Sequence, residues 1–128
     1  SDTYAFGIDG TNIVGGYPDG GNHGFIYDGS TYTTLDVPGA NDTYAYGIDG
    51  GHIVGSFYDG SSNHGFSYDG STYTTLDVPG ASYTHATGID GDNIVGYYTD
   101  GSGNRHGFLA TIPEPATLPL LALGLLLA

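Results

Sequence analysis

Three histidines stand at equivalent places in the sequence, each at the start of a His-Gly-Phe tripeptide. They are His23, His64 and His106. Imidazoles are common ligands of Zn²⁺, so three that converged in a closed three-fold fold would form a metal site. The alternative is structural, with each histidine beginning a strand and hydrogen-bonding a neighbouring turn. A repeat carries its residues to equivalent positions whether or not they meet, which favours the structural interpretation.

A loop that begins with Asp-Gly and ends with Asn precedes each of these histidines. Clustered side-chain oxygens are what Ca²⁺ prefers, so the loops are candidate calcium sites. The candidate ligands are Asp19, Asn22, Asp59, Asn63, Asp100 and Asn104. None of the loops follows the EF-hand pattern, and Asp before Gly is also ordinary turn chemistry. We therefore expect no cofactor, with calcium as the alternative to test.

No motif in the chain is typical of an enzyme. The serines lack a G-x-S-x-G elbow and no phosphate-binding loop is present. Cysteine is absent, which excludes disulfides, thiol nucleophiles and Cys-ligated zinc. We expect a protein without enzymatic activity. Asn41 begins an Asn-Asp-Thr sequon and is a candidate glycosylation site.

An internal repeat supplies the elements that position these residues. Gly7-Ile8-Asp9-Gly10 recurs from Gly47 and again from Gly88, and residues 27–40 return unchanged at 68–81. The repeat predicts one domain over residues 1–112, built of units 3–42, 43–82 and 83–112, and a tail over 113–128.

Each unit is predicted to be a four-stranded antiparallel meander. In the first unit the strand-favouring runs are 4–8, 12–17, 23–27 and 31–37. Asp-Gly pairs separate the runs and predict type I′ turns, while frequent glycine disfavours helix. The expected core consists of Ile8, Ile13, Phe25, Leu35, Val37 and their equivalents.

The predicted fold class is all-β. Four strands in about 40 residues are typical of a propeller blade, although closed propellers have about 4–8 blades. Three units also suit a trefoil-like or prism-like fold, so that alternative stays open. The third unit ends after its third strand, which leaves one fourth-strand position without an occupant from the repeat. Such an open edge invites another chain to pair there.

The order of these motifs resembles the bacterial extracellular repeat family named for its His-Ala-Phe (HAF) tripeptide. The tripeptide here follows I-V-G-x-Φ-x-D-G and precedes Y-D-G and L-D-V-P-G-A. Gly24, Gly65 and Gly107 stand where that family has Ala. The resemblance covers about residues 3–112. It implies an exported, propeller-like repeat protein with no established catalytic activity.

The tail resembles the PEP-CTERM sorting signal of exopolysaccharide-producing Gram-negative bacteria. Pro113-Glu114-Pro115 precedes an apolar stretch over 116–128, and no Arg cluster follows it. As a helix rising about 1.5 Å per residue, this stretch falls short of a ~30 Å hydrocarbon core, so we expect no stable membrane anchor. The tail is expected to be a short helix from about Leu118 or a strand in the vacant position. Its composition favours the helix.

The composition narrows the choice of partners. The 128 residues carry 14 Asp and Glu against one Arg, a net charge of −13, which excludes nucleic acid as a partner. We expect a secreted structural protein of the bacterial surface or biofilm matrix that self-associates, as an oligomer or filament, through open sheet edges and its tail. The alternative is a module that binds extracellular polysaccharide or calcium. The tail residues expected to self-associate are Leu118, Leu120, Leu121, Leu123, Leu125, Leu126 and Leu127.

Overall fold

The computed structural model describes residues 2–112 and 124–127, and these residues form β-strands, turns and no helix. The strands of the first unit are β1 (Tyr4–Asp9), β2 (Asn12–Pro18), β3 (Asn22–Tyr27) and β4 (Tyr32–Leu35). Those of the second are β5 (Asp42–Asp49), β6 (His52–Tyr58), β7 (Asn63–Tyr68) and β8 (Tyr73–Leu76). The third contains β9 (Tyr83–Asp90), β10 (Asn93–Thr99) and β11 (Arg105–Thr111), and β12 (Gly124–Leu127) follows. The all-β prediction is confirmed.

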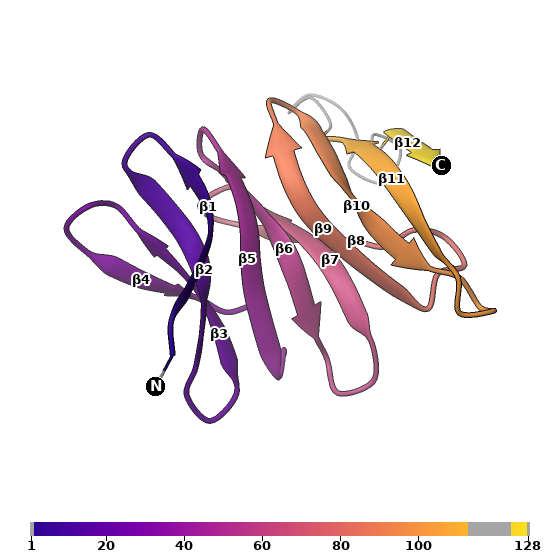
Figure 1. Ribbon diagram of the computed structural model, residues 1–128, viewed down its shortest axis with the longest axis horizontal. Helices are drawn as coiled ribbons and strands as arrows, with labels where there is room; N and C mark the ends of the chain where they lie inside the picture. Colours follow the sequence, from indigo (N-terminus) through magenta and orange to yellow (C-terminus); the bar gives the residue numbers. More distant parts are fainter. Residues whose placement is uncertain (1, 113–123, 128) are drawn as a thin grey trace.

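Consecutive strands within each unit pair antiparallel. A single parallel pairing between Asn22 and Asp42 joins β1–β8 into one sheet of eight strands, while β9–β12 form a separate sheet of four. Across the described residues the sheets are open and do not close into a ring. Figure 1 shows the three groups of strands following one another along the long axis of the molecule.

The hairpin turns differ from the predicted type I′. A type I′ turn needs positive φ at both central residues, whereas type II′ needs it only at the first, which is then Gly. The turn between β1 and β2 has a φ of 60° at Gly10, and no non-Gly residue among those described has a positive φ. The prediction was wrong because the strand continues through Asp9, which moves Gly10 to the first central position.

The glycine of each Ile-Val-Gly motif lies where a side chain has no room. A Cβ on Gly15 would fall 1.8 Å from the Tyr4 carbonyl oxygen and 2.8 Å from the ring of Phe25. Gly15 pairs with Ala5, beside the bulge in β1 between Ala5 and Gly7. Gly55 and Gly96 are equally confined. In each unit the ring of the Phe thus packs on the Gly, at the place where a side chain would otherwise stand.

The units pack face to face and bury two apolar clusters. The first cluster joins units one and two through Val14, Leu35, Val37, Ala45, Ile48, Ile53, Phe57 and Phe66. The second joins units two and three through Val54, Leu76, Val78, Ala86, Ile94, Phe108 and Ala110. Most of the expected core is confirmed, including Phe25, Leu35 and Val37. Three of the expected residues are not fully buried, since Ile13 and Ile89 are half-buried and Ile8 is 68% exposed.

The described end of the tail is a strand. β12 pairs antiparallel with β11, with Phe108 opposite Leu127, in the place where Phe25 faces Thr34 of β4 in the first unit. It therefore occupies the vacant fourth-strand position, whereas the composition favoured a helix. The remainder of the expected helix falls on residues 113–123, outside the described residues. The described residues include no helix able to cross a membrane.

Candidate functional site

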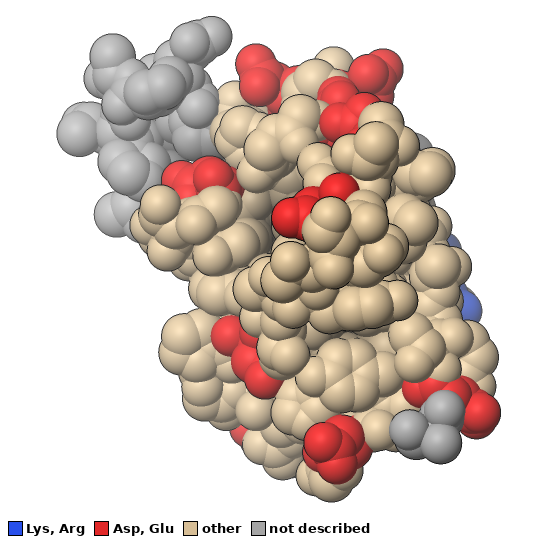
Figure 2. Space-filling view, turned by 90° about the vertical axis from the view of Figure 1, so that its left-hand side faces the viewer, with Lys and Arg blue, Asp and Glu red and all other residues tan. Residues whose placement is uncertain are grey.

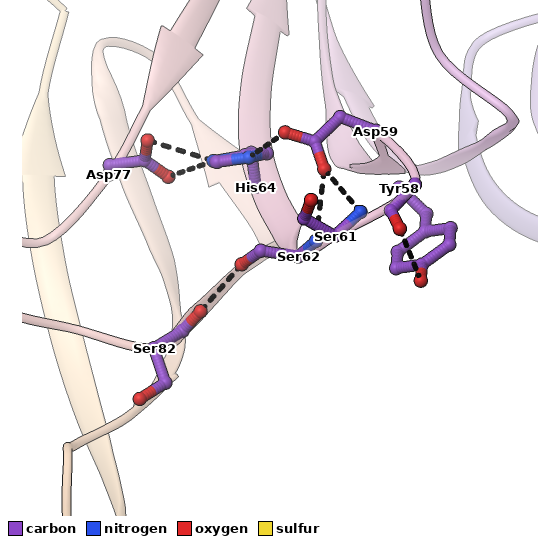
Figure 3. Close-up of polar contacts among 8 residues, drawn as sticks. Tyr58, Asp59, Ser61, Ser62, His64, Asp77 and Ser82 are labelled. Carbon is purple, nitrogen blue, oxygen red and sulfur yellow. Dashed lines mark hydrogen bonds and ion pairs between the residues drawn. The ribbon is translucent and has the colours of Figure 1, made fainter.

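His64 lies between two carboxylates and ties together two parts of its unit. Its Nδ1 is 3.0 and 2.9 Å from the two carboxylate oxygens of Asp77, which follows β8. Its Nε2 is 2.8 Å from Oδ2 of Asp59, in the turn before β7. Figure 3 shows the imidazole bridging the two acids. We call each such arrangement a His–Asp clasp.

The clasp recurs with variations in the other units. His23 Nδ1 is 2.9 Å from both carboxylate oxygens of Asp36, and its Nε2 is 3.0 Å from the Asp19 carbonyl oxygen. In the third unit, His106 Nε2 is 2.9 Å from Oδ2 of Asp100. The three histidines thus bond turns within their own units. Among the described residues, no three His, Asp or Glu side chains are grouped to hold a metal.

The surroundings of His23, His64 and His85 shift the pKa values of these imidazoles. Hydrogen bonds to Asp36 and to the Asp19 carbonyl raise the pKa of His23 above its ordinary 6.5. Burial lowers the pKa of His64, but hydrogen bonds to Asp59 and Asp77 outweigh burial and the net shift is upward. His85 has no carboxylate partner in the part of the chain that the structure describes, and burial and the nearby Arg105 charge lower its pKa.

In two of the three candidate calcium loops, the carboxylates of Asp59 and Asp100 are engaged in turns. Asp59 Oδ1 accepts the N–H groups of Ser61 and Ser62 at 2.8 and 2.9 Å. These bonds, together with His64, lower the pKa of Asp59 to about 2. The bonds from His106 and from the Asn104 N–H likewise lower the pKa of Asp100 to about 2. The loops therefore supply their own donors to these oxygens.

The remaining candidate residues are dispersed. Asn22 donates its backbone and side-chain N–H groups to Asp42, at 2.8 and 3.0 Å. Asn63 begins β7, and Asn41 lies exposed just before β5. Of the tail leucines, those at 125–127 belong to β12, and those at 118, 120, 121 and 123 lie outside the described residues.

The two ends of the stack expose residues that the repeat buries elsewhere. Ile8 is 68% exposed in unit one, whereas its equivalent Ile48 is 7% exposed against unit one. At the other end Val95 is 49% exposed, whereas Val14 and Val54 are 0% exposed. We call the surface around Ala5 and Ile8 the leading face, and that around Gly88 and Val95 the trailing face. Figure 2 views the first-unit end, where uncharged surface separates small groups of acidic side chains.

An aromatic groove runs along the junction of units one and two. Its volume is about 430 Å³. The rings of Phe6 and Tyr46 are 5.2 Å apart across the junction, and Tyr4 stacks on Phe6 at 6.3 Å. The groove is lined by Tyr4, Phe6, Gly16, Tyr17, Pro18, Asn22 and Tyr44.

Several carboxylates with clear roles were not singled out from the sequence. Asp36 and Asp77 each lie 13 residues after the histidine that they bond, and this repeated spacing is a usable signal. Asp9 accepts the N–H of Gly50, in the next unit, at 2.6 Å, and Asp49 accepts that of Gly91. The recurrence of these aspartates in the repeat could have indicated a contact between units.

The geometry of the described residues is that of a stack whose polar clusters hold turns and whose ends are open. Comparison with known proteins adds no relative to this description. No family model, no curated protein and no solved structure matches the chain.

Proposed function

We propose that this chain is a secreted, non-enzymatic structural protein of the surface or biofilm matrix of a Gram-negative bacterium, and that it self-associates. The observation that carries the proposal is the pair of open faces. Ile8 and Val95 are 68% and 49% exposed, although their equivalents inside the stack are buried. The terminal units of a stack need polar outer faces if they are to remain uncovered, so apolar residues at both ends indicate an interaction site.

The sequence resemblances support the location. The HAF-like motifs and the tail resembling a PEP-CTERM signal both belong to exported bacterial proteins. We place the units as propeller-like blades in an open arrangement, in which each blade requires a neighbour to cover its faces. The tail leucines and the sheet edges are further surfaces through which copies could join.

Sedimentation velocity and negative-stain microscopy of the purified chain test the proposal. We expect the mean sedimentation coefficient to rise with concentration, and particles larger than one chain to appear without added ligand. A chain that remains monomeric across the concentration range would contradict the proposal.

The aromatic groove favours a second candidate function, the binding of extracellular polysaccharide. Aromatic rings offer flat apolar faces to sugar rings, and Asn22 and Tyr17 offer hydrogen bonds at the same groove. Binding of a monomeric chain to a glycan array, lost on Tyr4→Ala, would support this function. Assembly without any glycan would instead favour the structural role.

A further inference from the structure

We propose that the leading face of one copy packs on the trailing face of another, reproducing between chains the contact that joins units within the chain. The inference rests on the proposed function and names its contact surface. The occupant of each open face is thus a second copy of this chain.

Burial at equivalent positions gives the first argument. Inside the chain, the face that carries Ala45 and Ile48 covers the face that carries Val14, and all three are at most 7% exposed. The leading face repeats the first of these surfaces, with Ala5 and Ile8. The trailing face repeats the second, with Val95. The leading face of one copy therefore matches the trailing face of another.

The glycines between units give the second argument. A Cβ on Gly7 would lie 3.1 Å from the Cα of Gly47, and one on Gly47 would lie 3.3 Å from the Cα of Gly88. In contrast, among the described residues a Cβ on Gly88 would meet only Val95 Cγ2, at 3.2 Å, within its own unit. Gly7 and Gly47 thus each permit the backbone of the next unit to approach closely, whereas no described backbone of another unit approaches Gly88 in this way. Gly7 of another copy is the residue equivalent to the missing neighbour.

The aspartates between units give the third argument. Asp9 accepts the N–H of Gly50 at 2.6 Å, and Asp49 accepts that of Gly91. The next members of this series are Asp90 at the trailing face and Gly10 at the leading face. In the proposed contact, Gly10 of one copy donates its N–H to Asp90 of the other. The contact thus gains a hydrogen bond as well as apolar burial.

The contact joins different faces, so it is head to tail. A heterologous contact closes into a ring or propagates into a filament, according to its rotation. Both outcomes use the same surface.

Variants that place a charge on one face test the inference. In Ile8→Asp and in Val95→Asp, the new carboxylate would be buried without a partner, so we expect the apparent dissociation constant to rise about a hundredfold or more. Ile8→Asp keeps an intact trailing face, and Val95→Asp keeps an intact leading face. An equimolar mixture of the two should therefore form a one-to-one dimer that neither forms alone, as measured by sedimentation velocity.

Ser71→Asp is the matched control, because it adds the same charge at an exposed position in the turn between β7 and β8 of the middle unit, away from both faces and from the strand edges. Thermal melting of each variant checks that it folds. Wild-type assembly that persists in both face variants would overturn the inference and leave the proposed function standing. So would folded variants that do not pair in the mixture. A monomeric wild-type chain would overturn both proposals.

Discussion

At the scale of single residues, the histidines show how a repeat assigns different electrostatic surroundings to the same side chain. His64 meets two carboxylates, whereas His23 meets one carboxylate and a carbonyl. His85 stacks on Tyr97 at 4.8 Å and meets no carboxylate of residues 2–112 or 124–127, while the guanidinium of Arg105 lies 5.0 Å from the Tyr97 ring. Hydrogen-bonded carboxylates favour the imidazolium, and burial beside a cation opposes it. The pKa values of the histidines should therefore diverge.

We predict that, in an NMR titration of the imidazole protons, His23 and His64 titrate above pH 6.5 and His85 below it. Asp77→Asn removes one partner of His64 and should lower its pKa, whereas Asp28→Asn, in a turn of the first unit, should not. Stability from His23 and His64 is fully present below pH 6.5 and is lost as pH rises through their raised pKa values. Equal pKa values for His64 and His85 would contradict the clasp.

At the scale of elements, the burial of a strand residue depends on the unit that packs against it. Val54 and Val95 occupy equivalent positions on β6 and β10, next to the same glycine. Val54 is 0% exposed because unit three covers it, whereas Val95 is 49% exposed. Identical local sequence therefore gives different contributions to stability.

We predict that Val54→Ala lowers the free energy of unfolding by about 2 kcal/mol, because it opens a cavity in the buried cluster. The matched variant Val95→Ala should change it by less than about 0.5 kcal/mol, because the side chain is half exposed. Urea unfolding followed by circular dichroism, at a concentration where the chain is monomeric, measures both. Similar losses for the two valines would show that the third unit is covered within the monomer.

The strands could be predicted from the sequence because their signals are local. The predicted runs 4–8 and 12–17 correspond to β1 (Tyr4–Asp9) and β2 (Asn12–Pro18) within one residue. The exposure of Ile8 could not be predicted, because it depends on which unit lies beside it. The strand at Gly124–Leu127 was the less favoured of the two predicted alternatives, because pairing with β11 overrides the helix propensity of leucine.

Part of the candidate site could also be predicted, because some of its contacts join residues that are close in sequence. The sequence indicates that His23 and its equivalents bond neighbouring turns, because each turn is only a few residues away. It does not show that Asp36 reaches His23, since that contact depends on the register of β3 with β4, where Gly24 faces Leu35. Contacts set by register need the sheet as well as the pattern.

At the scale of the whole molecule, charge opposes the association that the open faces favour. Each chain carries a net charge of −13, and most of its acids belong to Asp-Gly pairs that the repeat multiplies. Two copies that meet must bring these charges together, and water screens them only in part. Salt shortens the screening length from about 10 Å at 0.1 M to about 3 Å at 1 M. Assembly should therefore depend strongly on ionic strength.

We predict that self-association strengthens as NaCl is raised, and that CaCl₂ and MgCl₂ at equal ionic strength act alike. The reason is that Asp59 and Asp100, in the candidate calcium loops, already accept N–H groups of their own turns. Light scattering across a salt series measures the association. A stronger effect of Ca²⁺ than of Mg²⁺ that is lost in Asp59→Asn would instead support a calcium site in these loops. Association that weakens with salt would show that ion pairs, rather than apolar faces, join the copies.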